Sequence, residues 1–359
     1  NLVHRPVRSL ISIIAVAVEV ILILLIVGLF TGMLESSKER TRNLGDVMVR
    51  PPGSAMLIGM GSASISQTYA TVIARQAHVS AVTPVNWQLA AQSSVDVIWG
   101  IDLKSFEAVA GPFVYVAGGP FTSPDSIIVD DVYASANHVG VGSKVTALAH
   151  DFTISGVVQS GKGGRRFLPL PSMQEVSGTP GKASAFFVKA ESPAYAEAVV
   201  NEIKNVKGMQ TWSVMTIKEW LSLMTPENIP GFSTAVDIAI GVAVIIGFIV
   251  IFQAMYAAVM ERTREIGILK SLGAGKGYIV NLVLRETVLL AIVGILLGIA
   301  LSYVARVAIH SRIATIPILL TADWNARATL IAICGAIMGA LYPAIKAARK
   351  DPIDALAYE

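Results

Sequence analysis

Four long stretches of the sequence are almost free of polar side chains, and they constrain the fold more than any other feature. A helix crosses the hydrocarbon core of a membrane in about 20 residues, because that core is about 30 Å thick and each residue rises about 1.5 Å. The stretches reach or approach this length, and the last is the shortest and is rich in small residues. We therefore predict a membrane protein with four transmembrane helices. The stretches are Ser9–Phe30, Ile238–Val259, Thr287–Val304 and Ala328–Ala344.

The composition agrees with a membrane protein and excludes several other classes. Of the 359 residues, 53% are hydrophobic and 15% are charged, whereas an average globular chain is about 25% charged. This excludes a disordered chain and a coiled-coil rod. The single cysteine, Cys334, allows no intramolecular disulfide. The basic residues are scattered, so we expect no nucleic acid as a partner.

Residues 34–230, between the first and second apolar stretches, have the composition of a soluble domain. They hold 15 Lys and Arg against 16 Asp and Glu. Short strand-like runs, such as Ser126–Asp131, are broken by Gly, Pro and Asn. Ile65–Ala77 and Tyr195–Val206 have helical spacing of apolar residues. We predict a large mixed α+β extracytoplasmic domain of one or two lobes between helices 1 and 2, which divides the chain into 1–33, 34–230 and 231–359.

The distribution of basic residues predicts the orientation. With four spans both termini lie on one side, and the short segments expected there hold ten Lys and Arg, against three (Arg306, Arg312 and Arg327) in the short loop opposite. Cytoplasmic loops carry the excess of positive charge. We expect cytoplasmic termini in a multi-pass membrane protein, although Lys38, Arg40 and Arg42 weaken the argument.

Motifs for catalysis or cofactor binding fail on inspection. Gly156–Gly163 fits G-x-x-x-x-G-K but lacks the final Ser or Thr, and Pro169 and Pro171 forbid the helix that should follow. We interpret this segment as a flexible basic hairpin tip. Asp130-Asp131 is read as a strand end with a polar turn rather than a metal-binding pair. We therefore predict no enzyme, no catalytic residue, no metal and no bound cofactor.

Glu19 is a candidate intramembrane polar site. It lies roughly 15 Å into the first span, near the centre of the bilayer, where a charge is costly. Two interpretations remain open: a contact for a proton or a substrate, or a protonated side chain that hydrogen-bonds across a helix interface. The second is favoured. Asp237 and Gln253 are candidate partners.

The segment Met260–Ala274, between the second and third spans, predicts a short amphipathic helix. Charged pairs lie three residues apart, Ile266 and Leu269 share one face, and Gly273 is placed to end the helix. Such a helix either lies on the membrane surface without a partner or docks a cytoplasmic protein.

This segment closely resembles the second cytoplasmic region of ABC-transporter permeases of the FtsX/MacB type (type VII). The end of the chain, Tyr342–Leu356, is similar to the closing motif of the family, and His4–Leu10 to its basic opening segment. The resemblance implies a permease of a bacterial inner membrane. Such a permease uses no cofactor itself and transmits the motion of a separate cytoplasmic ABC ATPase, which uses ATP. It assigns ATPase coupling to the helix at 261–274, and there to Glu261, Arg262, Arg264, Glu265, Gly267, Leu269, Lys270, Leu272 and Gly273.

Several functions are compatible with this resemblance. The first is export of a small molecule, a peptide or a lipid-linked cargo, with a periplasmic adaptor as a further partner and membrane lipid around the spans. The alternatives are a non-transporting regulator of a cell-wall hydrolase and a lipoprotein-releasing permease. Some family members carry a fused N-terminal ATPase, for which we expect no room in this chain unless residues precede Asn1.

Four spans offer too little surface to enclose a pathway, so we expect a dimer of two copies or of this chain and a paralogue. We also expect the first span to line the interface, with two Glu19 side chains facing each other.

Overall fold

The computed structural model covers the 359-residue chain, and we describe all of it except residues 1–5, 55–63, 91–95, 230, 314 and 351–359. The chain divides into two compact units. We call residues 1–32, 231–311 and 316–359 the helical unit, and residues 33–230 with 312–315 the α+β unit. The parts of the opening and closing family motifs at His4–Arg5 and Asp351–Leu356 lie outside the described residues.

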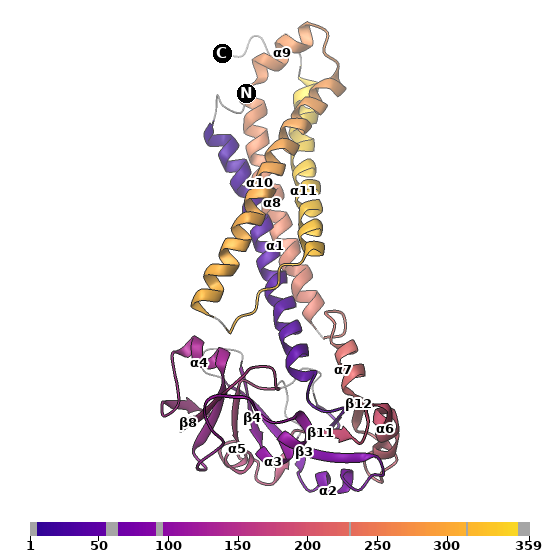
Figure 1. Ribbon diagram of the computed structural model, residues 1–359. Helices are drawn as coiled ribbons and strands as arrows, with labels where there is room; N and C mark the ends of the chain where they lie inside the picture. The colour runs from indigo at the N-terminus through magenta and orange to yellow at the C-terminus, as the bar shows by residue number, and fades with distance from the viewer. Residues whose placement is uncertain (1–5, 55–63, 91–95, 230, 314, 351–359) are drawn as a thin grey trace. The chain divides into compact units, whose positions relative to one another are not determined.

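The helical unit is built from long helices that run alongside one another (Figure 1). Four of the described helices are long and apolar enough to cross a membrane, which confirms that part of the predicted fold class. A short fifth helix, α9, joins α8 to α10. The helices are α1 (Pro6–Thr41, whose last turns belong to the α+β unit), α8 (Phe232–Glu261), α9 (Thr263–Ser271), α10 (Lys276–Arg312) and α11 (Ala322–Arg349).

Small side chains let α11 pack closely along α8. Ala332, Ala336, Ala340 and Ala344 follow at four-residue spacing and are fully buried. Residues four apart lie on one face of a helix, so these alanines form a continuous flat stripe. The short, small-residue character of the fourth apolar stretch therefore serves packing between helices.

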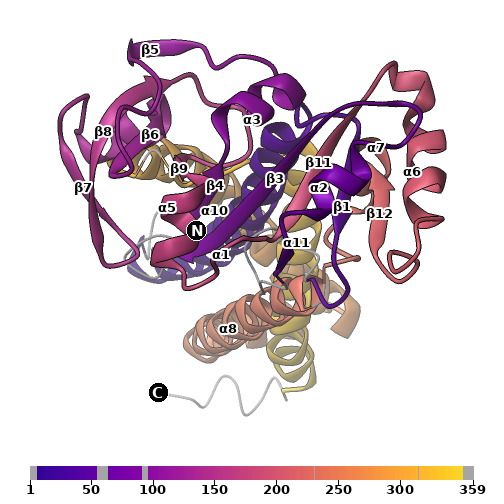
Figure 2. The ribbon, with the colours of Figure 1, turned by 90° about the horizontal axis from the view of Figure 1, so that it is seen from below.

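The α+β unit contains a mixed sheet of ten described strands, in the order β12-β1-β11-β3-β4-β9-β6-β8-β5, with β7 paired to β8. Figure 2 looks onto β1, β11, β3 and β4 side by side. Most pairs are antiparallel, but β4 with β9 and β6 with β8 are parallel. The strands are β1 (Val47–Arg50), β3 (Val79–Ala90), β4 (Asp96–Ile101), β5 (Tyr115–Gly118), β6 (Ser126–Asp130), β7 (Lys144–Ala147), β8 (His150–Val158), β9 (Arg166–Pro169), β11 (Ala185–Ala190) and β12 (Ser213–Thr216), with β2 (Ile65–Ser66) and β10 (Lys182–Ala183) paired apart.

Two hydrophobic clusters lie toward opposite ends of this sheet. One gathers around Phe186 and Trp212, and the other around Phe152 and Met173. Between them, Trp87 of β3 lies opposite Trp99 of β4, and Trp99 stacks on Phe187 of β11.

The α+β unit also contains short helices. They are α2 (Tyr69–Ile73), α3 (Leu103–Ala110), α4 (Asp131–Asn137), α5 (Leu170–Val176), η1 (Pro193–Tyr195), α6 (Ala196–Lys204) and α7 (Ile217–Leu223).

The α+β architecture between α1 and α8 confirms the predicted fold class, but two local predictions are wrong. The helix predicted over Ile65–Ala77 is shorter, because Ile65 and Ser66 pair with β10 instead. Gly156–Gly163 is not a flexible hairpin tip. Gly156 lies within β8, and β8 and β9 are not paired with each other. The loop itself is held by the hydrogen bonds described below.

Candidate functional site

The inner face of α9 is fixed to the long helices. Thr263, Ile266 and Gly267 are buried. Arg262, just before α9, donates two hydrogen bonds from Nη1 to Glu286 of α10, 3.0 Å to Oε1 and 2.8 Å to Oε2. Lys270 donates from Nζ to the carbonyl oxygens of Ala348, at 3.0 Å, and of Lys350, at the end of α11. These hydrogen bonds connect α9 to both α10 and α11, so a displacement of α9 would act on both helices.

The outer face of α9 is open and combines apolar and charged side chains. Ile268 is 46% exposed and Leu272 is 81% exposed. Arg264 and Glu265 are exposed beside them. Gly273 follows with a φ of +96°, a conformation that favours glycine, and the chain turns there into α10. A surface of this kind suits a partner that brings apolar and charged groups of its own.

The residues assigned to ATPase coupling therefore divide into two groups. Arg262, Gly267 and Lys270 face the helical unit, and Leu269 packs partly against its core. Glu261 ends α8 and is exposed. The residues on the open side are Glu261, Arg264, Glu265, Leu272 and Gly273.

Glu19 lies inside the bundle of its own chain. The residue is 2% exposed, and neither carboxylate oxygen has a hydrogen-bond partner among the described residues. A Cβ at Gly247 of α8 would lie 2.1 Å from Oε2, and one at Gly335 of α11 would lie 3.5 Å from Oε1. The carboxyl group thus occupies the space that a side chain at position 247 would take.

Two expectations about Glu19 are wrong for this reason. The side chain faces α8 and α11 of the same protomer, so it cannot face a second Glu19 across a dimer. The hydrogen bond expected across a helix interface is also absent from the described residues, and Asp237 and Gln253 are exposed. The sequence shows that a carboxylate lies at this depth, but not toward which neighbour it points.

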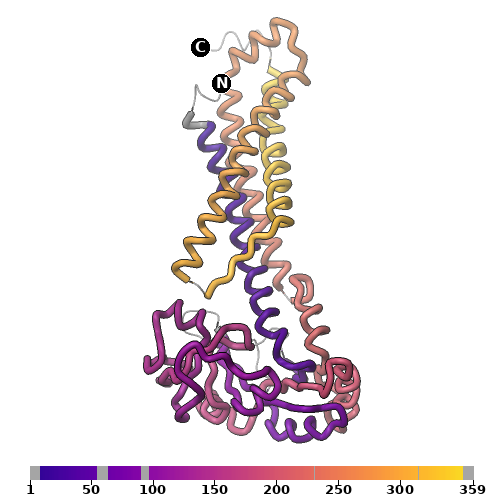
Figure 3. The backbone as a smooth tube through the Cα atoms, viewed as in Figure 1, coloured from indigo at the N-terminus to yellow at the C-terminus, as the bar shows by residue number. Residues whose placement is uncertain are grey.

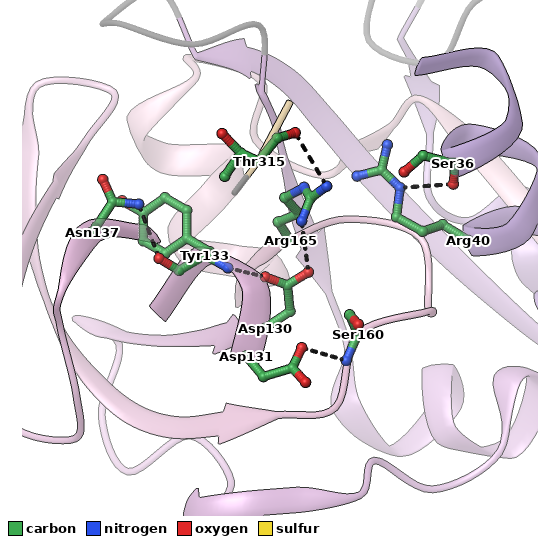
Figure 4. Close-up of polar contacts among 9 residues, drawn as sticks. All are labelled: Ser36, Arg40, Asp130, Asp131, Tyr133, Asn137, Ser160, Arg165 and Thr315. Atoms are coloured by element: carbon green, nitrogen blue, oxygen red, sulfur yellow. Dashed lines mark hydrogen bonds and ion pairs between the residues drawn. The ribbon is translucent and has the colours of Figure 1, made fainter. Parts of the chain in front are cut away.

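A second buried carboxylate, Asp130, lies where β6 ends and α4 begins (Figure 4). Its Oδ1 accepts a hydrogen bond of 2.6 Å from the backbone N–H of Tyr133 and so caps α4. Its Oδ2 lies 3.5 Å from Nη1 of Arg165. Burial raises the pKa of Asp130 to about 6, although the Tyr133 N–H and Arg165 act in the opposite direction.

Arg165 joins this carboxylate to a segment distant in sequence. Its Nη2 donates a hydrogen bond of 3.5 Å to the carbonyl oxygen of Thr315, which follows α10 (Figure 4). Sequence reasoning placed Asp130 at a strand end, which is correct, but expected a polar turn where α4 begins, and it missed Arg165 and Thr315. The available signal was the pair Arg165-Arg166, which forms a short basic run with Lys162 around two glycines.

Comparisons with known proteins agree with this architecture. The family model of the MacB-like periplasmic core domain matches residues 9–206, and that of the FtsX-like permease C-terminal domain matches residues 238–352. The chain belongs to the FtsX/MacB-type family of ABC transporter permeases. Together the two models extend over most of the α+β unit and most of the four long helices.

Similar proteins include other permeases of this family. The uncharacterized ABC transporter permease YknZ of Bacillus subtilis is 39% identical over 127 residues, which are 35% of this chain and 32% of the relative. The macrolide export ATP-binding/permease protein MacB of Rhodopirellula baltica is 31% identical over 180 residues, which are 48% of this chain and 26% of the relative. The matches thus span about a third and about a quarter of the lengths of these relatives.

Among solved structures, the periplasmic region of MacB from Actinobacillus actinomycetemcomitans matches 50% of this chain and 94% of that structure. Its sequence identity is 15% and its TM-score is 0.40.

Proposed function

We propose that this chain is the permease subunit of an ATP-driven transporter and transmits the motion of a separate ATPase to the α+β unit across the membrane. The ATPase docks on the open face of α9, and the chain itself catalyses no reaction. The observation that carries this proposal is α9: its inner face is bonded to α10 and α11, while Ile268 and Leu272 are exposed on its outer face. A protein bound to the outer face of α9 would therefore be connected, through this one short helix, to the two spanning helices α10 and α11.

The proposed orientation places α9 and both termini in the cytoplasm. The short segments on that side hold ten Lys and Arg, against three in the loop opposite. The α+β unit then lies outside the cytoplasm, which agrees with the description of the matching family model as a periplasmic core domain. The ATPase and the α+β unit are thus on opposite sides of the membrane, and the helices are the connection between them.

Export is the activity that we propose for the complex, with a small molecule, a peptide or a lipid-linked compound as cargo. The relatives that share the family include proteins named for macrolide export. The α+β unit, essentially residues 33–230, is large for a regulator of a cell-wall hydrolase, and this favours the exporter. A periplasmic adaptor would receive the motion outside the membrane.

A second copy of the chain or a paralogue completes the proposed assembly, because four helices cannot enclose a pathway. The outer side of α1 is available for this contact. Ile11, Ile14, Val18 and Leu22 are all at least 37% exposed and recur at helical spacing on this side. The contact would be apolar and would not involve Glu19.

Site-specific cross-linking tests the docking site. A photoreactive residue at Leu272, in membranes of cells that express the chain, should give an adduct with a protein that carries nucleotide-binding motifs. Arg264→Glu and Ile268→Ser should reduce that adduct at least fivefold without lowering the amount of permease in the membrane, because both side chains are exposed. Arg306→Glu, a charge reversal at an exposed site near the other end of α10, is the matched control and should leave the adduct unchanged.

The same experiment tests the orientation. An ATPase captured from Leu272 places α9 in the cytoplasm. A second protein carries the photoreactive residue at position 306. Capture of the ATPase from position 306 and not from 272 would overturn both the docking site and the orientation.

A further inference from the structure

The segment between α10 and α11 lies against α1. Residues 313–321, which we call the strap, form no helix or strand at the positions that the structure describes. The backbone N–H of Leu319 donates a hydrogen bond of 2.8 Å to the carbonyl oxygen of Gly28. A Cβ at Gly32 would lie 2.2 Å from the carbonyl oxygen of Pro317. Glycine at this position therefore lets the strap touch the backbone of α1, and the tube in Figure 3 follows its course.

The beginning of the strap is bonded to the α+β unit, to which residues 312–315 belong. The carbonyl oxygen of Thr315 accepts the hydrogen bond from Arg165, whose other terminal nitrogen lies at Asp130. Arg165 is 9% exposed and Asp130 is 1% exposed. The attachment is therefore made in a buried place, where water competes little for the guanidinium group.

The loop that carries Arg165 is itself firmly held. The backbone N–H of Gly163 donates a hydrogen bond of 2.8 Å to the carbonyl oxygen of Arg40, in the last turn of α1. The backbone N–H of Asp130 donates one of 2.8 Å to the carbonyl oxygen of Arg165. Gly163 and Gly164 lie flat on Trp99, where a Cβ on either would come within 2.6 Å of the indole ring. Arg165 thus projects from a rigid base.

We propose that the strap is a load path between the α10–α11 pair and the α+β unit, with Arg165 as the residue that attaches it and Asp130 as a positioning residue. This inference rests on the proposed function, in which the helices transmit motion. The chain passes between the two units within α1, at 32/33, just before α8, at 230/231, and on either side of residues 312–315. Motion of the helices could then reach the α+β unit through α1 and α8 and, in addition, from α10 and α11 through the strap.

The chemistry of Asp130 supports a role beyond folding. Capping of α4 uses only Oδ1, and an asparagine would cap a helix equally well. The charge therefore serves the second oxygen, which faces Arg165. A buried ion pair is often no more stabilising than neutral residues of the same shape, so stability alone gives little reason for it.

Protonation of Asp130 should loosen the attachment. The groups that face this carboxyl are Arg165, Arg40 and the N–H of Tyr133, which lower its pKa, and Asp131, which raises it. With burial included, the pKa is about 6. The carboxylate that positions Arg165 is therefore present at pH 7.5 and largely lost at pH 5.

The attachment is tested on the full chain in lipid nanodiscs, without ATP. Cys334, the single cysteine, is replaced by Ser, and a spin label is placed at Ile313, which lies on the strap and is 46% exposed. Arg165→Gln should increase the mobility of the label at least twofold at pH 7.5. Arg75→Gln, at an exposed site of the α+β unit, is the matched control and should leave it unchanged.

The role of Asp130 is read from the pH dependence of the same label. Lowering the pH from 7.5 to 5 should increase the mobility in the wild type. Asp130→Asn, which keeps a cap for α4, should show the high mobility at both pH values. Tryptophan fluorescence confirms that each variant is folded. Unchanged mobility in folded Arg165→Gln protein would overturn the attachment.

Transmission is tested with the ATPase bound. Spin labels at Arg306 of α10 and Lys204 of α6 report the ATP-driven change in distance, which Arg165→Gln should reduce at least twofold while ATPase binding stays the same. A full-sized change in this variant would overturn the load path. If no ATPase binds even the wild type, the proposed function fails and the load path with it, and the attachment is still decided by the label at Ile313.

Discussion

The two units bury a carboxylate in opposite surroundings. Glu19, in the helical unit, lies against Gly247 and Gly335 and has no hydrogen-bond partner among the described residues. Asp130, in the α+β unit, is as deeply buried but caps a helix and faces Arg165. Burial alone therefore does not define what a carboxylate does. Glu19 fills space in a membrane helix bundle, whereas Asp130 positions the guanidinium group of Arg165.

The difference follows from the solvent around each unit. A lone charge at the centre of a bilayer costs about 2.5–3.5 kcal/mol on insertion scales, so a carboxyl group without a partner is favoured there only in its neutral form. In a domain surrounded by water, a strand end and a helix N-terminus supply an N–H donor, and a nearby loop supplies an arginine. We therefore expect the two residues to respond differently to substitution and to pH.

The largest effect is expected when a permanent charge replaces Glu19. Glu19→Lys should destabilise the helical unit by roughly 3 kcal/mol, because the ammonium group would be buried among apolar helices without a partner. Glu19→Gln, a neutral group of the same shape, should differ from the wild type by less than about 0.5 kcal/mol. Thermal unfolding of the chain in nanodiscs measures both, and equal stability of the two variants would mean that the carboxyl group is not enclosed.

A smaller effect is expected from filling the space opposite Glu19. A Cβ at Gly247 would lie 2.1 Å from Oε2, so Gly247→Ala should cost about 1–3 kcal/mol through overpacking. Gly241 lies in the same helix with no atom within 4 Å of its Cβ position. There Gly241→Ala should stabilise the chain by about 0.5–1 kcal/mol, since alanine favours the helix. The unfolding temperatures of these two variants separate the effect of steric contact from that of helix propensity. A shift of the same sign in both variants would contradict the tight fit at Gly247.

The sequence was sufficient for what depends on composition and periodicity. Four apolar stretches and a balanced, strand-rich segment predicted the fold class, which the structure confirms. Directions within the bundle were beyond reach, because Glu19 lies in a stretch that is apolar on every side and periodicity therefore marks no face.

Contacts over long sequence separation were equally hidden. Arg165 and Thr315 are 150 positions apart and meet through a carbonyl oxygen, which every residue carries and which leaves no mark in the sequence. The segment that ends at Gly163 was interpreted as a flexible hairpin tip, whereas the structure places Gly163 and Gly164 against Trp99, where no Cβ would fit. Glycine permits both a flexible turn and a close contact, and only the neighbouring ring distinguishes the two.

The smallest effect concerns Asp130 and has a sign that depends on pH. The pKa of its carboxyl group is raised from 3.8 to about 6 in the folded chain, because burial disfavours the charged form. A group whose pKa is raised on folding contributes stability that is present below the unfolded pKa and is lost as the pH rises through the folded pKa. Between pH 5 and pH 7.5 the wild type should therefore lose about 1 kcal/mol relative to Asp130→Asn, which does not titrate.

Unfolding of the α+β unit, followed by tryptophan fluorescence at the two pH values, measures this difference. Four of the five tryptophans, at 87, 99, 212 and 220, lie in that unit. Asp151→Asn, at an exposed carboxylate of β8, should keep the pH slope of the wild type. The direction is opposite to that expected for the strap, since low pH stabilises the fold around Asp130 while it releases Arg165. If the stability of the α+β unit and the attachment of the strap were both lost at low pH, the carboxylate would be retained for stability. Asp130 would then differ from Glu19 only in having hydrogen-bond and ion-pair partners.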